Sequence, residues 1–166
     1  MPDVERTRFL EIMASFPSGV AIVTTLDADG RPRGLTTSAV CSVSAEPPLL
    51  LVSVDLASRT LPLLLERRGF VVNFLRAGRE ELASLFASKA EEKFDGVAWR
   101  PGLGGLPVLG DDALAWAQCT TEREIEAGDH LLLLGRVEAG EAAGPDEQPL
   151  MYYHRSWGQW TPRPTS

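Results

Sequence analysis

Residues 33–73 decide the fold, and they read RGLTTSAVCSVSAEPPLLLVSVDLASRTLPLLLERRGFVVN. The run 35–43 is rich in Thr, Ser and Val, which predicts a strand with small side chains on one face. Pro47 and Pro48 interrupt that strand, because proline has no N–H to donate to a strand ladder. The apolar run 49–54 then predicts a second, buried strand.

A short helix is predicted to follow these two strands. Thr60 precedes an apolar run that contains Pro62, and proline is tolerated in a first helical turn, so Thr60 is the predicted N-cap. Gly69 is predicted to end the helix, with Arg67 and Arg68 in its last turn, where cations suit the helix dipole.

Polar groups beside this helix start indicate a candidate ligand site. Free N–H groups and hydroxyls at a helix N-terminus suit a phosphate. The run Thr36-Thr37-Ser38 can turn hydroxyls and backbone amides toward a planar polar heterocycle. An ordinary strand–loop–helix with a capped end explains the same residues, and taken alone they favour that simpler interpretation.

Length and composition restrict the class of protein. The chain has 166 residues, of which 44% are hydrophobic and 23% charged, as in a single globular domain. We expect one domain over 1–166, with its core at about 9–155 and a C-terminal tail at 156–166. The net charge of −7 argues against nucleic acid as a partner, because a phosphate backbone needs a basic surface. No apolar run is long enough for a membrane span and no signal-peptide pattern opens the chain, so a cytoplasmic location is predicted.

Metal and disulfide chemistry have little support in the sequence. Cys41 and Cys119 lie far apart in strand-like segments, which predicts two buried, reduced thiols. The chain has two His residues, and neither clusters with Cys at a ligand spacing, so no metal site is predicted.

The remaining patterns predict short strands and helices in alternation. Phe9, Ile12, Met13 and Phe16 form one apolar stripe, which predicts an N-terminal helix. Other predicted segments are a hairpin at 19–43, strands at 69–75, 113–126, 130–138 and 149–153, a helix at 79–87, and loops at 95–112 and 140–147. The predicted fold class is mainly β with α, a small antiparallel barrel with peripheral helices. The chain has neither a GxGxxG fingerprint after a strand nor a P-loop.

Taken together, several blocks resemble one known family in order and spacing. They are FPSGVAIVTT at 16–25, GLTTSAVCSVSAEPPLLLVSV at 34–54, SRT at 58–60, FVVNFL at 70–75, LFASKAEEKF at 85–94 and GDHLLLLGRV at 128–137. Over residues 9–155 the chain resembles the short-chain flavin reductases, which have a split β-barrel fold that binds flavin. Each block alone is a weak signal, and the set is a strong one.

The resemblance implies an NAD(P)H-dependent flavin reductase, an enzyme that transfers hydride from NADH or NADPH to FMN or FAD. It also implies a homodimer that supplies reduced flavin to a separate monooxygenase. Two alternatives stay open. The same barrel can hold FMN as a fixed electron carrier, or it can use bound flavin to oxidise another small substrate.

The resemblance also implies the site residues. The residues along the flavin ring and ribityl chain are Thr36, Thr37, Ser38 and Ala39, with Val54 and Asp55 beside them. The hydroxyl pair for the flavin phosphate is Ser58 and Thr60. A second group on the phosphate or adenine side consists of Ser88, Lys93 and Phe94. His130 is implied near the nicotinamide, and the residues that close the site are Tyr153 and Arg155.

Several of these side chains have a plainer interpretation. His130 can be a turn residue bonded to the neighbouring Asp, and Lys93 a surface lysine. Arg59 can supply a phosphate-binding charge as well as Lys93 can. Trp157 and Trp160 are expected at an interface or in the core, more than as a lid over the pocket.

Overall fold

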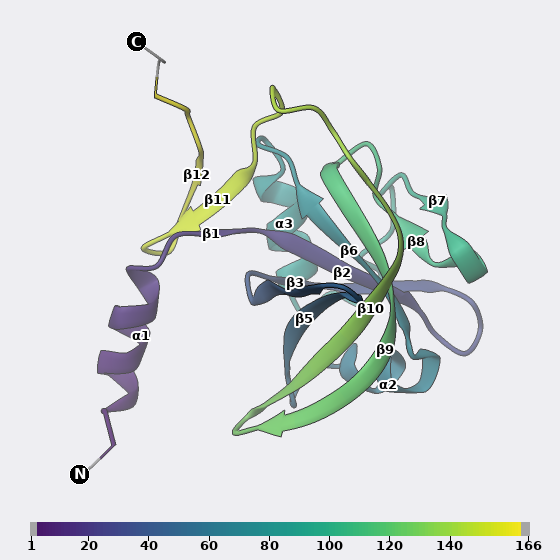
Figure 1. Cartoon of the computed structure of the whole chain (residues 1–166), viewed down its shortest axis with the longest axis horizontal. Helices are drawn as coiled ribbons and strands as arrows, with labels where there is room; N and C mark the ends of the chain where they lie inside the picture. The colour runs from purple at the N-terminus through teal and green to yellow at the C-terminus, as the bar shows by residue number, and fades with distance from the viewer. Residues whose placement is uncertain (1–2, 164–166) are drawn as a thin grey trace.

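A seven-stranded antiparallel sheet forms the centre of the molecule, which is described for residues 3–163 by a computed structural model (Figure 1). The strand order is β3-β2-β6-β9-β10-β5-β4, and a three-stranded sheet β1-β11-β12 and a two-stranded sheet β7-β8 lie beside it. The elements are α1 Arg6–Ala14, β1 Ser18–Gly19, β2 Ala21–Leu26, β3 Pro32–Thr37, β4 Val40–Ala45, β5 Pro48–Asp55, α2 Leu61–Arg67, β6 Gly69–Leu75, α3 Glu80–Ala87, β7 Arg100–Pro101, η1 Leu103–Gly105, β8 Pro107–Val108, β9 Ala113–Ala127, β10 His130–Ala142, β11 Leu150–Tyr153 and β12 Ser156–Gln159. The predicted mainly-β fold class is confirmed.

The single strand predicted at 35–43 is wrong, because β3 and β4 are separate strands. They occupy the two opposite edges of the seven-stranded sheet although only residues 38–39 separate them. The Thr37 hydroxyl accepts the Ala39 N–H at 3.0 Å, a local bond that competes with continuation of the strand. Ala39 O then accepts the Ser53 N–H at 3.0 Å, which brings the chain onto β5. The barrel is therefore split at its edges and joined there by a two-residue bend.

The helix α2 begins where predicted and ends differently. Thr60 is the N-cap residue, but its side chain makes no capping hydrogen bond. Arg68, and not Gly69, ends the helix in the left-handed region at φ 53°. Bonds to β9 fix that conformation, because the Arg68 guanidinium donates to Thr121 O at 3.0 Å and pairs with Glu124 at 3.0 Å. Gly69 is the first residue of β6.

The segment predicted as a surface loop at 95–112 contains ordered, partly buried structure. It holds β7, η1 and β8, and Leu106, Val108 and Leu109 are buried. Polar side chains from the sheet replace the missing strand partners of this segment. The Asn73 side-chain oxygen accepts the Leu109 N–H at 2.8 Å, and Gln118 bonds both backbone groups of Leu103. Composition alone missed these long-range bonds.

The β9–β10 hairpin is longer than the sequence predicted. The second strand runs to Ala142, so the loop begins at residue 143, three residues after its predicted start at 140. Gly128 has φ +63° at the tip, which suits a tight turn. Residues 122–127, at the end of the first strand of this hairpin, are exposed. At the C-terminus, residues 156–159 of the predicted tail form β12, and residues 164–166 lie outside the described part.

The two cysteines differ in burial, so the prediction of a buried thiol is wrong for Cys41. Cys119 is buried between β6 and β10, and burial raises the pKa of its thiol to about 12. Cys41 is exposed. It lies on β4, which pairs only with β5 and forms an edge of the sheet, so one side of its strand has no cover.

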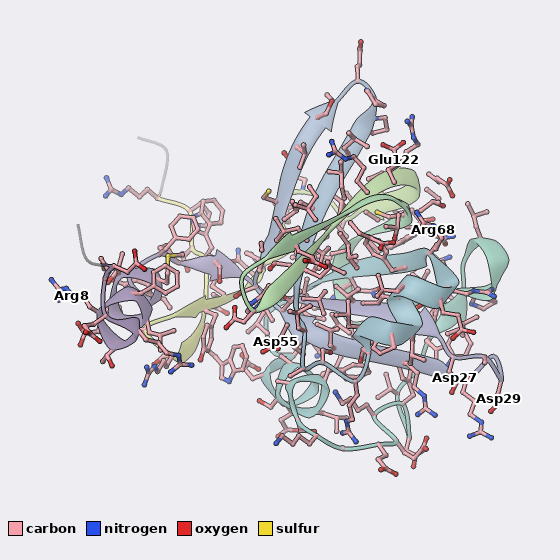
Figure 2. The ribbon with its side chains drawn as sticks, turned by 90° about the horizontal axis from the view of Figure 1, so that it is seen from below. Arg8, Asp27, Asp29, Asp55, Arg68 and Glu122 are labelled. Carbon is pink, nitrogen blue, oxygen red and sulfur yellow. The ribbon has the colours of Figure 1, made fainter. Side chains whose placement is uncertain are left out.

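The predicted N-terminal helix exists, and its apolar stripe is exposed. None of the residues of α1 is buried, and Phe9 and Ile12 keep 54% and 53% of their surface accessible. Figures 1 and 2 show α1, which carries Arg8, projecting from the barrel on the side opposite Asp27 and Asp29. Its end is attached through the Ala14 carbonyl, which accepts the His154 N–H at 3.1 Å. Among residues 3–163, no helix is long and apolar enough to cross a membrane.

Candidate functional site

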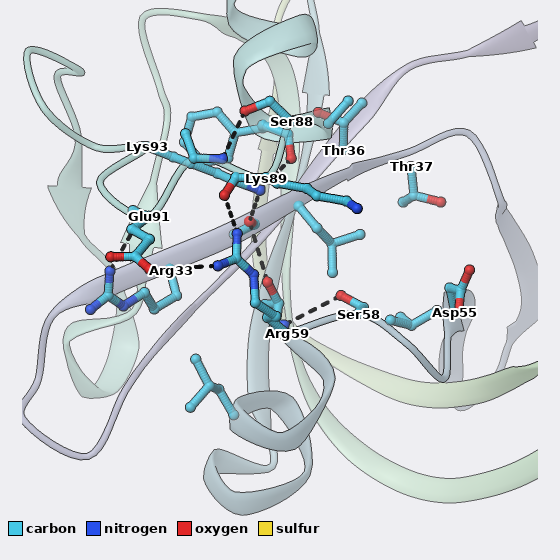
Figure 3. A pocket seen from close by; sticks show the side chains of 18 of the residues that line it. Arg33, Thr36, Thr37, Asp55, Ser58, Arg59, Ser88, Lys89, Glu91 and Lys93 are labelled. Carbon is cyan, nitrogen blue, oxygen red and sulfur yellow. Dashed lines mark hydrogen bonds and ion pairs between the residues drawn. The ribbon is translucent and has the colours of Figure 1, made fainter.

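A groove of about 930 Å³ runs along the outer edge of β3. Its walls are β3, the end of β5 with the loop into α2, and the segment that follows α3. We call residues 88–94, the segment that follows α3, the strap. Figure 3 shows the groove from close by, with Thr37 and Asp55 toward one end and Arg33 and Glu91 toward the other. A volume of this size is typical of a cofactor or ligand site.

The backbone of β3 presents hydrogen-bonding groups to the groove. β3 is an edge strand, and its Gly34 carbonyl points outward, where it accepts from the Thr60 hydroxyl and from Lys93 Nζ at 3.4 Å each. Backbone groups of alternate strand residues point to the same side, so the N–H and C=O of Thr36 share that edge. The Thr36 hydroxyl itself donates to Ala83 O at 2.7 Å. It is therefore the Thr36 backbone that remains to bond a group in the groove.

The loop after β5 is arranged by hydrogen bonds among its own residues. The Asp55 carboxylate accepts the Ala57 N–H at 2.7 Å, and its carbonyl accepts the Ser58 N–H at 2.9 Å. The Ser58 hydroxyl oxygen accepts the Thr60 N–H at 3.3 Å. Thr60 is only 8% exposed and uses its hydroxyl on Gly34. Of the predicted hydroxyl pair, Ser58 is thus the one that can turn its O–H toward the groove.

Four basic side chains line the groove. The strap contributes Lys89 and Lys93, and the walls contribute Arg33 and Arg59. Lys93 Nζ donates to Phe86 O at 2.7 Å, which holds it over the groove. Its pKa is lowered, mainly by burial and then by the charge of Arg59. In a chain with a net charge of −7, such a local cluster suits a small anionic group.

His130 lines the groove at the end that also holds Asp55. Its Nδ1 lies 2.7 Å from the Asp129 carboxylate, so the plainer interpretation of a His bonded to the neighbouring Asp is correct for one ring nitrogen. That bond, and then the charge of His130, lowers the pKa of Asp129. His130 also faces Asp55 across the β5–β10 pair and lines the groove. The second ring nitrogen, Nε2, lies on the other side of the ring from this bond.

The structure brings most of the predicted site residues into one groove. Those that line it are Thr36, Thr37, Val54, Asp55, Ser58, Thr60, Ser88, Lys93, Phe94 and His130. Ser38 instead lines a neighbouring cavity of about 430 Å³, with Tyr152 and Trp157 on its other side. Ala39 lies at the bend between β3 and β4. Their contacts with a ligand stay predictions.

Tyr153 and Arg155 line neither cavity among the described residues. Tyr153 is the last residue of β11, and Arg155 lies in the turn between β11 and β12, where it has φ 60°. Trp157 and Trp160 are 38% and 54% exposed, so they are not core residues, and the Trp157 ring contacts that of Tyr152 at 4.8 Å. The interface interpretation of the two tryptophans stays open.

Sequence reasoning missed several residues of the groove. They are Arg33, Gly34, Ser53, Leu63, Lys89 and Glu91. Arg33 could have been found, because it lies in the predicted hairpin at 19–43 and meets the carboxylate of Asp27, in the turn of that hairpin, at 3.0 Å. Lys89 and Glu91 carry no such signal, since only the tertiary structure places the strap against the groove. Within residues 3–163 there is no group of three or more His, Cys, Asp or Glu that could hold a metal ion.

Comparison with known proteins identifies the family. The model of the flavin reductase like domain matches residues 13–161, nearly the whole chain. The chain belongs to the flavin reductase-like family. The predicted resemblance is thus confirmed, and so is the predicted class of enzyme at the level of this family.

Flavin reductases from several bacteria are similar to this chain. The flavin reductase (NADH) of Kitasatospora aureofaciens is 47% identical over 158 residues, which cover 95% of this chain and 83% of that protein. The flavin reductase (NADPH) of Lentzea aerocolonigenes is 37% identical over 152 residues, 91% of this chain and 88% of that protein. The crystal structure of BorF, the flavin reductase component of a bacterial two-component tryptophan halogenase, superimposes with a TM-score of 0.83 at 32% identity and covers 95% and 99% of the two chains.

Proposed function

We propose that this protein is an NAD(P)H-dependent flavin reductase that transfers hydride from a reduced nicotinamide to FMN or FAD. The observation that carries the proposal is the polarity of one groove. Arg59, Lys93 and the Ser58 hydroxyl lie between its two ends. The edge of β3 and His130 line the end that holds Asp55. A flavin has the same arrangement, an anionic phosphate joined through a polyol chain to a polar, planar ring.

The groove residues fit the two parts of a flavin. Ser58, Lys93 and Arg59 suit the phosphate, because bonds to charged groups are the stronger hydrogen bonds. The outward N–H of Thr36 suits the polar edge of the ring, where reduction increases negative charge. A second planar ring needs space beside the first, and the groove of about 930 Å³ extends to Asp55 and His130, which line it.

The chemistry of hydride transfer belongs to the flavin and the nicotinamide, and the protein supplies binding and orientation. Thr36 and Thr37 orient the flavin ring along β3. His130 has its Nδ1 held by Asp129, so its ring is fixed with Nε2 directed away from that bond. That nitrogen is the atom we assign to the nicotinamide amide.

We also propose that the protein acts as a homodimer and passes reduced flavin to a separate monooxygenase. The support for the dimer is the exposed stripe of α1, continued by Phe16 at 69% exposure. A second copy is the occupant that fits, because within residues 3–163 this apolar stripe stays exposed. Arg6 of α1 lies near enough to add to the lowering of the Asp129 pKa, after the larger effects of His130.

Steady-state kinetics test the proposed activity. Oxidation of NADH and of NADPH is followed with FMN, FAD or riboflavin added at rising concentrations. We expect the rate to saturate with flavin as it does with a substrate. Flavin that copurifies and never exchanges would instead favour a fixed prosthetic group, and no oxidation of either nicotinamide would contradict the proposal.

Sedimentation tests the dimer. Phe9→Asp with Phe16→Asp places two charges on the exposed stripe and is expected to convert a dimer into a folded monomer. The matched control is Arg8→Asp, on the same helix, with a side chain that already forms an exposed ion pair with Glu11. A wild-type protein that sediments as a monomer at micromolar concentration would contradict the dimer without affecting the proposed chemistry.

A further inference from the structure

Arg59 connects the two walls of the groove. It lies on the loop between β5 and α2, and its guanidinium donates to the Lys89 carbonyl of the strap. The same guanidinium pairs with the Glu91 carboxylate, with 3.8 Å between Nη1 and Oε1. Figure 3 shows this connection across the groove, with Ser58 and Asp55 on one side of Arg59 and Arg33 and Glu91 on the other.

The strap has separate attachments at its two ends. Lys93 anchors its C-terminal end through the carbonyls of Phe86 and Gly34. At the N-terminal end, Ser88 closes a turn by donating to Leu85 O at 2.7 Å. Between these ends, two arginines from the opposite walls hold the backbone, Arg59 at Lys89 and Arg33 at the Glu91 carbonyl, 3.1 Å away. Release of Arg59 would therefore remove one attachment from the middle of the strap and leave its two ends and the Arg33 bond to Glu91 in place.

Arg59 is held by partners that an anion can replace. Its side chain is 59% exposed and that of Glu91 is 84% exposed, and an ion pair of this kind contributes little stability in water. Its neighbours in the groove are the Ser58 hydroxyl and the ammonium of Lys93, whose lowered pKa comes from burial first and Arg59 second. Two cations therefore face the same space. A phosphate monoester carries nearly two charges, against one on a carboxylate.

We propose that Arg59 exchanges partners during catalysis: it leaves Lys89 and Glu91 for the phosphate of the incoming flavin, and Glu91 recaptures it as the flavin leaves. The inference rests on the proposed function in taking the ligand to be a phosphorylated flavin. Glu91 is thereby a competitor built into the site, which weakens flavin binding and speeds its release. That property suits an enzyme whose reduced flavin must reach another protein.

Equilibrium binding, followed by flavin fluorescence, tests the exchange without any nicotinamide. For Glu91→Gln we expect FMN and FAD to bind several-fold more tightly and to dissociate more slowly in stopped-flow displacement, with riboflavin changed less than twofold. For Arg59→Ala we expect phosphorylated flavins to bind about tenfold or more weakly, as for a lost bond to a charged group, with riboflavin again unchanged. In the double variant the gain from Glu91→Gln should vanish, because its partner is absent.

Glu92→Gln is the matched control. It removes the same charge from the adjacent strap position, where Glu92 pairs with Arg33 at 3.7 Å and not with Arg59. Equal gains from the two glutamate variants, or a gain from Glu91→Gln that persists in the Arg59→Ala protein, would reduce the effect to general repulsion and overturn the exchange. A riboflavin affinity that falls together with that of FMN would overturn it too.

The failure of this inference differs from the failure of the proposed function. If the wild-type protein binds FMN, FAD and riboflavin with equal affinity, the phosphate is not held at Arg59, and nicotinamide oxidation can still proceed. If it binds no flavin at all, the proposed function fails first.

Discussion

The ring of Phe86 packs directly on the backbone of Gly34. A Cβ atom added at Gly34 would lie 2.9 Å from Phe86 Cε1 and 2.9 Å from the Val23 carbonyl oxygen. These distances are shorter than side-chain contacts allow, so only glycine lets α3 approach β3 this closely. Since the strap follows α3 directly, this contact also sets the position of one wall of the groove.

Gly34→Ala is therefore expected to reduce both stability and flavin binding. Overpacking of a filled core site costs about 1–3 kcal/mol, which denaturant unfolding would measure. The flavin Kd should rise as well, because α3 must move away from β3. Gly144→Ala is the control, since a Cβ there meets nothing within 4 Å. Unchanged stability in Gly34→Ala would show that α3 is not packed as described.

Ser58→Ala and Thr60→Ala are expected to act differently although both remove a hydroxyl. The Ser58 O–H can turn to a phosphate, so its loss should weaken FMN binding by about tenfold, the cost of one bond to a charged group. Thr60 bonds the Gly34 carbonyl inside the protein, so its loss should lower the unfolding midpoint more than the FMN affinity. Titration of FMN and thermal unfolding of each variant separate the two. Equal losses of FMN affinity in the two variants would instead support the assignment of both hydroxyls to the flavin phosphate.

The affinity for FMN should depend on pH through Lys93. In the free protein its pKa is lowered below the ordinary 10.5 by burial and then by Arg59, and a bound phosphate would raise it. Binding then takes up a proton between these two pKa values. The affinity for FMN should therefore fall as the pH rises through the lowered pKa of Lys93, and the affinity for riboflavin should not.

Lys93→Arg provides the control for this pH dependence, because the guanidinium stays charged throughout the range. Fluorescence titrations at each pH should give a flat profile for that variant. A wild-type profile that is equally flat would mean that Lys93 does not face the phosphate.

The two thiols should react in separate conditions. At pH 8 iodoacetamide should label Cys41 in the native protein, because that residue is exposed. Cys119 is buried and its pKa is raised to about 12, so it should react only after denaturation. Mass spectrometry counts the labels, and Cys41→Ser should abolish native labelling. Labelling of Cys119 in the native state would show that β6 and β10 open locally.

The sequence predicted those parts of the fold that depend on local pattern. The strands at 49–54 and 69–75 and the helix after Thr60 follow from apolar runs and a tolerated proline, and they are present. The predictions that were wrong concern segments whose structure depends on residues far away in the sequence. Arg68 takes the left-handed position expected of Gly69 because β9 holds its guanidinium, and 95–112 is ordered because Asn73 and Gln118 reach it.

The candidate site, too, could be predicted from the sequence only in part. Family resemblance placed Ser58, Lys93 and His130, and all three line one groove. It could not show that the Thr36 hydroxyl is used by Ala83, or that Arg59 is held by the strap, because both depend on how α3 and its continuation pack. Tyr153 and Arg155 were assigned by position in the chain, and the turn that carries them lies outside the groove.

The bend at residues 38–39 connects β3 and β4, the two edge strands of the seven-stranded sheet. One margin carries the strand along which a ligand ring would lie, and the other joins β5, whose end forms the facing wall. The span between these walls is therefore set by covalent geometry over two residues and does not depend on side-chain packing alone. Insertion of even one residue at this bend should widen the opening and spare the rest of the barrel.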